Sequence, residues 1–61
     1  MIKVGDIVHI KNPASYQLTE DKGTASEVNG SIILVTFKDG STCQVLRSDL
    51  ECLRRKSQHH L

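Results

Sequence analysis

An Asn-Gly pair at positions 29 and 30 constrains the fold of this 61-residue chain more than any other feature. It lies between an alternating segment, residues 22–28, and the run 32–37, which is rich in β-branched and aromatic residues. An Asn-Gly pair between two such runs is a strong signal for a β-hairpin, because both residues tolerate positive φ angles in a type I′ turn. We therefore predict two antiparallel strands joined by a turn at Asn29-Gly30.

Alternating polarity elsewhere in the chain predicts three further strands. In the first of them, Val8 and Ile10 share one face, whereas His9 lies on the other. No segment carries the apolar i, i+3, i+4, i+7 stripe of an amphipathic helix, so the chain is expected to be all-β. The three strands are expected over residues 6–11, 42–46 and 51–54.

The connections follow from turn-forming residues. A turn is expected at 38–41, where Gly40 suits a positive φ angle. A single helical turn is expected at 48–50, with Ser48 as its N-cap. The longest connection is the polar, irregular segment 12–21, which begins with an Asn-Pro pair that ends the first strand.

Five short strands joined in this way fit a small closed or half-closed barrel, whose interior one set of apolar side chains fills. The segment 31–37 is expected to be the central strand, because so apolar a run is typical of a strand covered on both faces. The predicted core consists of Val4, Val8, Ile10, Ala25, Val28, alternate residues of 32–37, Val45, Leu50 and Leu53.

Size and charge predict one domain followed by a basic tail. Residues 1–53 carry five basic and seven acidic side chains, a net charge of −2. The net charge of +1 for the whole chain arises from Arg54, Arg55 and Lys56. We therefore expect a domain over 1–53 and a disordered tail over 54–61. The sequence has neither a membrane-spanning apolar run nor a signal peptide, so we expect a cytoplasmic, monomeric protein without a membrane partner.

Several segments resemble the SH3-like small-barrel superfamily. Residues 4–8 (VGDIV) resemble the opening strand of such barrels, and residues 22–28 (KGTASEV) resemble a KOW motif. Residues 35–41 (VTFKDGS) and 48–51 (SDLE) resemble later segments of the same superfamily. The resemblance covers about residues 3–53 and implies a five-stranded SH3-like barrel. It leaves the function open, because KOW-type barrels contact either RNA or protein and one fold hosts many activities.

No set of residues predicts catalysis. His9 is the one histidine within the domain, and an exposed strand position explains it better than a role as a general base. Turn chemistry and solvation account for the carboxylates of the Glu20-Asp21 pair and of Asp49 and Glu51. We therefore expect a protein that is not an enzyme.

The two cysteines, Cys43 and Cys52, are expected to be reduced thiols on adjacent strands. A labile disulfide and a metal site are the alternatives. A metal site would have to combine the cysteines with His9 and the terminal His59-His60 pair, which lacks the close ligand pairs of structural zinc. No cofactor is predicted.

The candidate interaction residues are Lys11, Tyr16, Lys22, Arg54, Arg55 and Lys56. Tyr16 lies in the long loop, where it either anchors an interface or packs back over the mouth of the barrel. The basic tail either attracts phosphates or keeps the domain soluble. The expected function is a small non-catalytic interaction module that binds another protein or acts as an accessory subunit. The alternative is weak, sequence-nonspecific RNA or DNA binding of KOW type through the first loop and the tail.

Overall fold

The structure, a computed structural model, describes residues 2–54 and is all-β, as predicted. Residues 2–54 include no helix with the length and hydrophobicity of a membrane span. The strands are β1 (Ile7–Ile10), β2 (Lys22–Asn29), β3 (Ile32–Thr36), β4 (Thr42–Leu46) and β5 (Leu50–Arg54). Two short 3₁₀ turns, η1 (Pro13–Tyr16) and η2 (Arg47–Asp49), lie in the connections.

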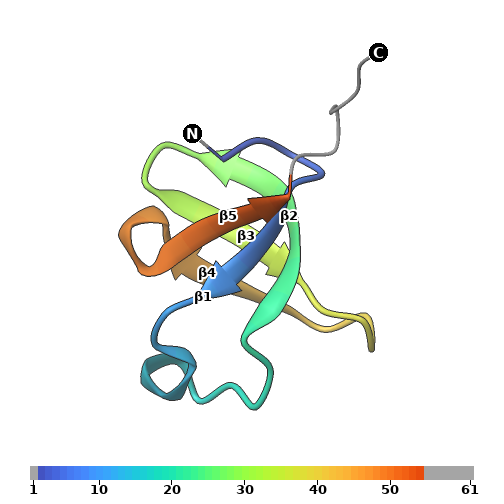
Figure 1. The fold of residues 1–61 in the computed structure, drawn as a ribbon, viewed down its shortest axis with the longest axis vertical. Helices are drawn as coiled ribbons and strands as arrows, with labels where there is room; N and C mark the ends of the chain where they lie inside the picture. Colours follow the sequence, from blue (N-terminus) through green and yellow to red (C-terminus); the bar gives the residue numbers. More distant parts are fainter. Residues whose placement is uncertain (1, 55–61) are drawn as a thin grey trace.

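The five strands form one antiparallel sheet in the order β4-β3-β2-β1-β5. The long strand β2 pairs with β1 at its beginning and with β3 over most of its length, and its register shifts between Ala25 and Glu27. Figure 1 shows the resulting curl, with β1 and β5 in front of β3 and β4. Within the described part of the chain no ladder joins β4 to β5, so the sheet is not closed.

The core lies on the inner face of the curled sheet. Val8, Ile10, Ile33, Val35 and Val45 are its largest fully buried side chains. Each such burial stabilises the fold by about 1.5–3 kcal/mol relative to exposure. The alternation predicted for the first and third strands is confirmed, because their buried residues are every second one. The remaining buried apolar residues are Ile2, Ala25, Phe37 and Leu50.

Three residues predicted for the core are exposed instead: Val4 at 60%, Val28 at 38% and Leu53 at 49%. Val4 lies in a tight turn, with a φ of 97° at Gly5 next to it, and Ile2 is buried in its place. Val28 lies near the end of β2, next to the turn of its hairpin, where it pairs with Ile33. Leu53 has no residue opposite it, because the β1–β5 register shifts there.

The predicted type I′ turn at Asn29-Gly30 is wrong by one residue. Asn29 pairs with Ile32, so Gly30 and Ser31 are the two central residues of the turn. Gly30 has a φ of +61°, whereas neither Asn29 nor Ser31 has a positive φ. A positive φ at the first central position alone is the signature of a type II′ turn. The expected positive φ at Gly40 is confirmed at 91°.

Two further expectations are corrected. The segment 31–37 was expected to be the central strand, covered on both faces. β3 has a strand on each side, but β2 occupies the middle of the sheet. β3 is buried on one face only, since Ile32 on its other face is 40% exposed. The helical turn comes one residue earlier than predicted. Its N-cap is Leu46 without a side-chain hydrogen bond, and Ser48 lies inside the turn.

Candidate interaction groove

A groove of about 500 Å³ opens between the beginning of β2, the outer side of β1 and the end of β3. The apolar residues Ile7 and Phe37 line it together with Thr24 and Thr36. Four exposed charged residues, Glu20, Asp21, Lys22 and Lys38, complete the lining. Phe37 is only 5% exposed, so Ile7 offers more of the apolar surface of the groove, which is bordered by charges of both signs.

Strand register brings the groove residues together. Thr24 pairs with Ile7 of β1 on one side and with Thr36 of β3 on the other, so these three residues lie side by side on the outer face. The hydroxyls of Ser26 and Thr36 are hydrogen-bonded to each other, which holds β2 and β3 together next to the groove.

Gly23 allows the two strands to approach closely at this point. A Cβ atom there would lie 2.5 Å from Val35 Cγ1, 2.9 Å from the Thr36 carbonyl oxygen and 3.2 Å from Phe37 Cδ1. These distances are shorter than van der Waals contact, so any other residue would push β2 away from β3. The shape of the groove thus depends on the absence of a side chain at position 23.

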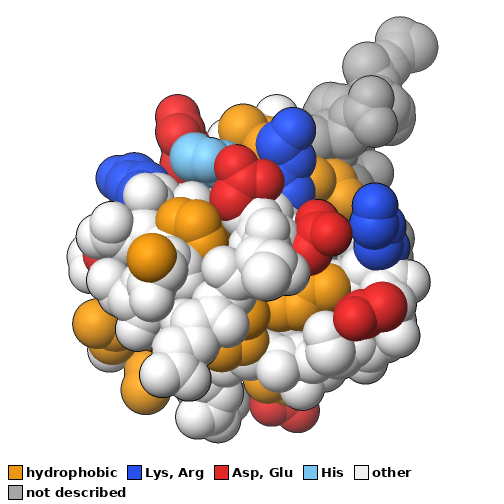
Figure 2. Space-filling view, turned by 90° about the horizontal axis from the view of Figure 1, so that it is seen from below, with side chains coloured by type: hydrophobic (Ala, Val, Ile, Leu, Met, Phe, Trp, Pro, Cys, Tyr) orange, Lys and Arg blue, Asp and Glu red, His pale blue; other side chains and the backbone are white. Residues whose placement is uncertain are grey.

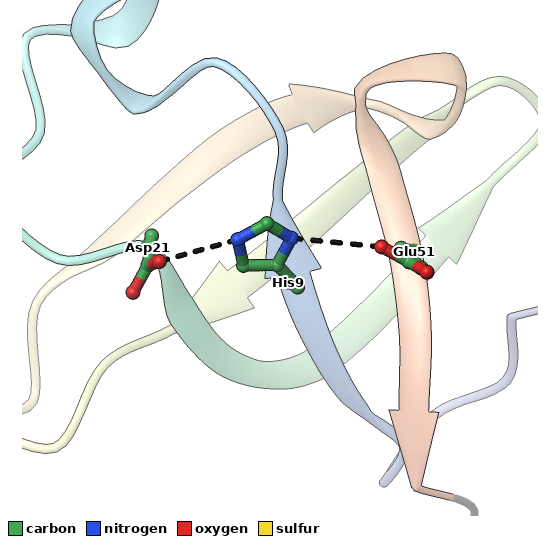
Figure 3. A network of polar contacts seen from close by, with 3 residues as sticks. All are labelled: His9, Asp21 and Glu51. Carbon is green, nitrogen blue, oxygen red and sulfur yellow. Dashed lines mark hydrogen bonds and ion pairs between the residues drawn. The ribbon is translucent and has the colours of Figure 1, made fainter.

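A charged cluster borders the groove at Asp21 (Figure 3). His9, on the outer face of β1, lies between two carboxylates, with Nε2 3.2 Å from Asp21 Oδ2 and Nδ1 3.7 Å from Glu51 Oε1. All three side chains are partly exposed. The cluster links β1, β5 and the segment before β2, and each pair is expected to contribute little, because surface ion pairs are screened by solvent.

The His9 cluster holds no nucleophile, and its partners were not predicted from sequence. In the described part of the chain the imidazole makes polar contacts only with the two carboxylates. Residues 2–54 contain no group of three or more His, Cys, Asp or Glu side chains placed to hold a metal ion. Glu51 lies opposite His9 because of the register between β1 and β5. No local sequence pattern predicts that register.

Figure 2 shows the end of the molecule that carries the long first loop. Acidic, basic and hydrophobic side chains are intermixed on this face, and the histidine has acidic side chains on both sides. The face therefore lacks the continuous basic stripe that typically tracks a nucleic-acid backbone.

Tyr16, at the end of η1, packs against the core, which is one of the two arrangements that its loop position allowed. Its hydroxyl donates to Asp49 Oδ2 at 2.6 Å and accepts the Leu46 backbone N–H at 3.2 Å. The bond to the Asp49 carboxylate raises the pKa of Tyr16 above its usual value, and the bond from Leu46 opposes that effect.

The other candidate residues are dispersed. Lys22 lines the groove and is exposed, whereas Lys11 is exposed outside it and bonds through its backbone N–H to the Asp49 carbonyl. Arg54 is the last residue of β5. Arg55 and Lys56 lie outside the described residues. The same holds for the rest of the tail predicted over 54–61, with the exception of Arg54.

The cysteines are not on adjacent strands. Cys43 is in β4 and Cys52 in β5, at opposite ends of the strand order, and both are free thiols. Cys52 Sγ lies 3.6 Å from Oδ2 of Asp6, which also accepts the Lys3 backbone N–H at 2.9 Å. Asp6 is buried, so the turn before β1 is held by a buried carboxylate that the sequence analysis did not identify.

No protein family, curated protein or solved structure matches the chain. The function is therefore inferred from the groove and its surroundings.

Proposed function

We propose that this chain is a small, non-catalytic interaction module that binds a segment of another protein in the groove. The observation that carries the proposal is the combination of Ile7 and Phe37 with exposed charges of both signs in one concave site. Binding sites for side chains are typically concave and apolar with a few polar groups that set orientation. A partner segment that fits offers an apolar side chain flanked by charged ones.

The proposed architecture is an SH3-like barrel of KOW type. Three features support it beside the sequence resemblance: the strand order, the strongly bent β2, and the 3₁₀ turn that leads into β5. This architecture leaves the outer face of β1–β3, with the groove, available to a partner.

The alternative, nonspecific nucleic-acid binding, has less support. Lys22 lines the groove beside Glu20 and Asp21, whose carboxylates would repel phosphates. Sequence-tolerant binding to single strands also uses aromatic side chains for stacking. The two aromatic side chains, Tyr16 and Phe37, are half-buried and buried. This alternative therefore depends on the basic residues that follow the domain.

The groove can be tested with a matched pair of charge reversals. Peptides selected from a random displayed library on the immobilised chain would be titrated into ¹⁵N-labelled protein. We expect shifts centred on Thr24, Thr36 and Lys38. We also expect at least about a fivefold loss of affinity in K38E but not in K11E, because Lys38 lines the groove and Lys11 does not.

The same titration with single-stranded RNA and duplex DNA separates the two functions. Tight nucleic-acid binding at physiological salt, weakened equally by K38E and K11E, would contradict the proposed protein-binding role. Peptide shifts that map elsewhere on the sheet would contradict the assignment of the groove.

A further inference from the structure

We propose that the free edge of β4 pairs with the same edge of a second copy of this chain, antiparallel, about a twofold axis at Cys43. The chain would be monomeric at micromolar concentration and pair when concentrated. This surface is separate from the groove, because no residue of β4 lines the groove. The inference therefore does not depend on the proposed function.

The hydrogen bonds that flank β4 show which backbone groups point away from the sheet. Phe37 N–H donates to the Ser41 carbonyl at 2.8 Å, and Arg47 N–H donates to the Ser31 carbonyl at 2.7 Å. In an antiparallel ladder, hydrogen-bonded and non-hydrogen-bonded pairs alternate. The register of β3 with β4 therefore directs Cys43 and Val45 toward β3 and the backbone groups of Thr42, Gln44 and Leu46 outward.

One outward group already has a partner. The Leu46 N–H donates to the Tyr16 hydroxyl at 3.2 Å, as expected for a group that points away from β3. Among residues 2–54, the outward N–H and carbonyl groups of Thr42 and Gln44 pair with no strand, and their one contact is 3.7 Å from the Cys43 thiol to the Gln44 carbonyl. Both residues are exposed.

These groups complement themselves in one register. When Thr42 lies opposite Gln44 of the second copy, each residue gives its N–H and accepts with its carbonyl, and the twofold axis repeats the pair. All the free donors and acceptors of Thr42 and Gln44 are then used, and Tyr16 stays in place. A register centred on Gln44 would instead pair Leu46 with Thr42 of the second copy. In each copy, the Leu46 N–H would then lose its hydrogen bond to the Tyr16 hydroxyl.

The composition of β4 does not oppose such pairing. Edge strands are commonly protected by charged side chains or proline, and β4 contains neither. The other edge strand, β5, carries two charged residues, Glu51 and Arg54, and is protected in this way. The outward groups of Thr42 and Gln44 are symmetric about Cys43, so a second copy satisfies the exposed edges of both molecules with one twofold axis.

The test compares two double variants that differ only in the sign of the charge at position 44. Sedimentation velocity from about 10 µM to about 1 mM is expected to show concentration-dependent dimers of the natural sequence. In T42K/Q44K the register places like charges opposite each other, and in T42K/Q44E opposite charges. We expect the dimer dissociation constant to be at least tenfold larger for T42K/Q44K than for T42K/Q44E, with both variants folded by circular dichroism.

Disulfide trapping tests the register. Cys43 of each copy would occupy a non-hydrogen-bonded pair, whose Cα separation of about 4.5 Å suits a disulfide. Oxidised glutathione accepts the two electrons and two protons of the thiols and leaves as two reduced glutathiones. We expect a covalent dimer from C52S and none from C43S.

Three results would overturn the proposal: only monomers at the highest concentration, dimers of T42K/Q44K as stable as those of T42K/Q44E, or a covalent dimer that forms through Cys52. The groove variant K38E should dimerise like the natural sequence. Failure of the proposed groove can therefore be distinguished from failure of the proposed β4 pairing.

Discussion

The Tyr16 hydroxyl donates a 2.6 Å hydrogen bond to Asp49 across 33 positions of the chain, and the same oxygen accepts the Leu46 N–H. One phenol thus ties the long first loop to η2 and to the last residue of β4. The ring also packs against the core. Tyr16 therefore covers the core and occupies one backbone donor of the β4 edge.

The bond to Asp49 predicts an alkaline titration above the usual tyrosine value of 10.0. A carboxylate acceptor favours the neutral phenol, so the pKa of Tyr16 is raised in the folded state. Its contribution to stability is complete below pH 10.0 and is lost as the pH rises through the folded-state pKa. Tyr16 is the one tyrosine and the chain has no tryptophan, so ultraviolet absorbance follows it directly. In D49N the pKa should fall toward its usual value, and identical titrations would contradict the bond.

Gly30→Val should destabilise the fold by about 1–2 kcal/mol, because a β-branched residue resists positive φ. The backbone at Gly30 has a φ of +61° with open space around the missing Cβ, so the cost is conformational and not steric. Thermal or urea unfolding measures the loss. Gly30→Ala is the matched control and should cost less, since alanine has no β-branch. Equal stability of the natural sequence and Gly30→Val would show a different turn.

Gly23→Ala should destabilise the fold by about 1–3 kcal/mol through overpacking, because its methyl group would meet Val35 and the Thr36 carbonyl. The methyl group would also push β2 away from β3 and so weaken peptide binding in the groove. In the Gly23→Ala background, Val35→Ala should cost less than it does alone, because it removes the Cγ1 atom in the clash. Additive effects in urea unfolding would show that the strands do not approach so closely.

The His9 cluster should contribute weakly and depend on salt. A double-mutant cycle between His9→Gln and Asp21→Asn is expected to give a coupling of about 0.2–1 kcal/mol at low ionic strength that declines in concentrated salt. The cycle with Glu51→Gln should give less, because that contact is 3.7 Å rather than 3.2 Å. A coupling that salt does not change would show that the contact is not an ion pair.

Neutralising Arg54, Arg55 and Lys56 with glutamine should leave peptide binding in the groove unchanged. It should remove any nucleic-acid binding, because these residues supply the excess positive charge. Three neutralised phosphates predict a log–log salt slope of about −2.7 on duplex DNA for the natural sequence. Filter binding over a range of salt concentrations measures the slope. Nucleic-acid affinity that survives the triple variant would place that activity on the domain.

The strands, their approximate limits and the inner faces of β1 and β3 were predictable from local sequence patterns. These features depend on side chains that alternate along a short segment, as at Val8 and Ile10 or at Ile33 and Val35. The positive φ of Gly40 was predictable for the same local reason. Such preferences act between neighbours in the chain and need no knowledge of what packs against them.

The groove, the His9 cluster and the role of Tyr16 arise from contacts between distant parts of the chain and were not predictable from the sequence. Each brings together residues from separate strands or loops, such as Thr24 with Thr36, or Tyr16 with Asp49. The exposure of Leu53 and the one-residue shift of the hairpin turn likewise follow from strand register. Register is set by the sum of core packing and hydrogen bonding over the whole sheet, and a slip of one residue reverses the face that each side chain occupies.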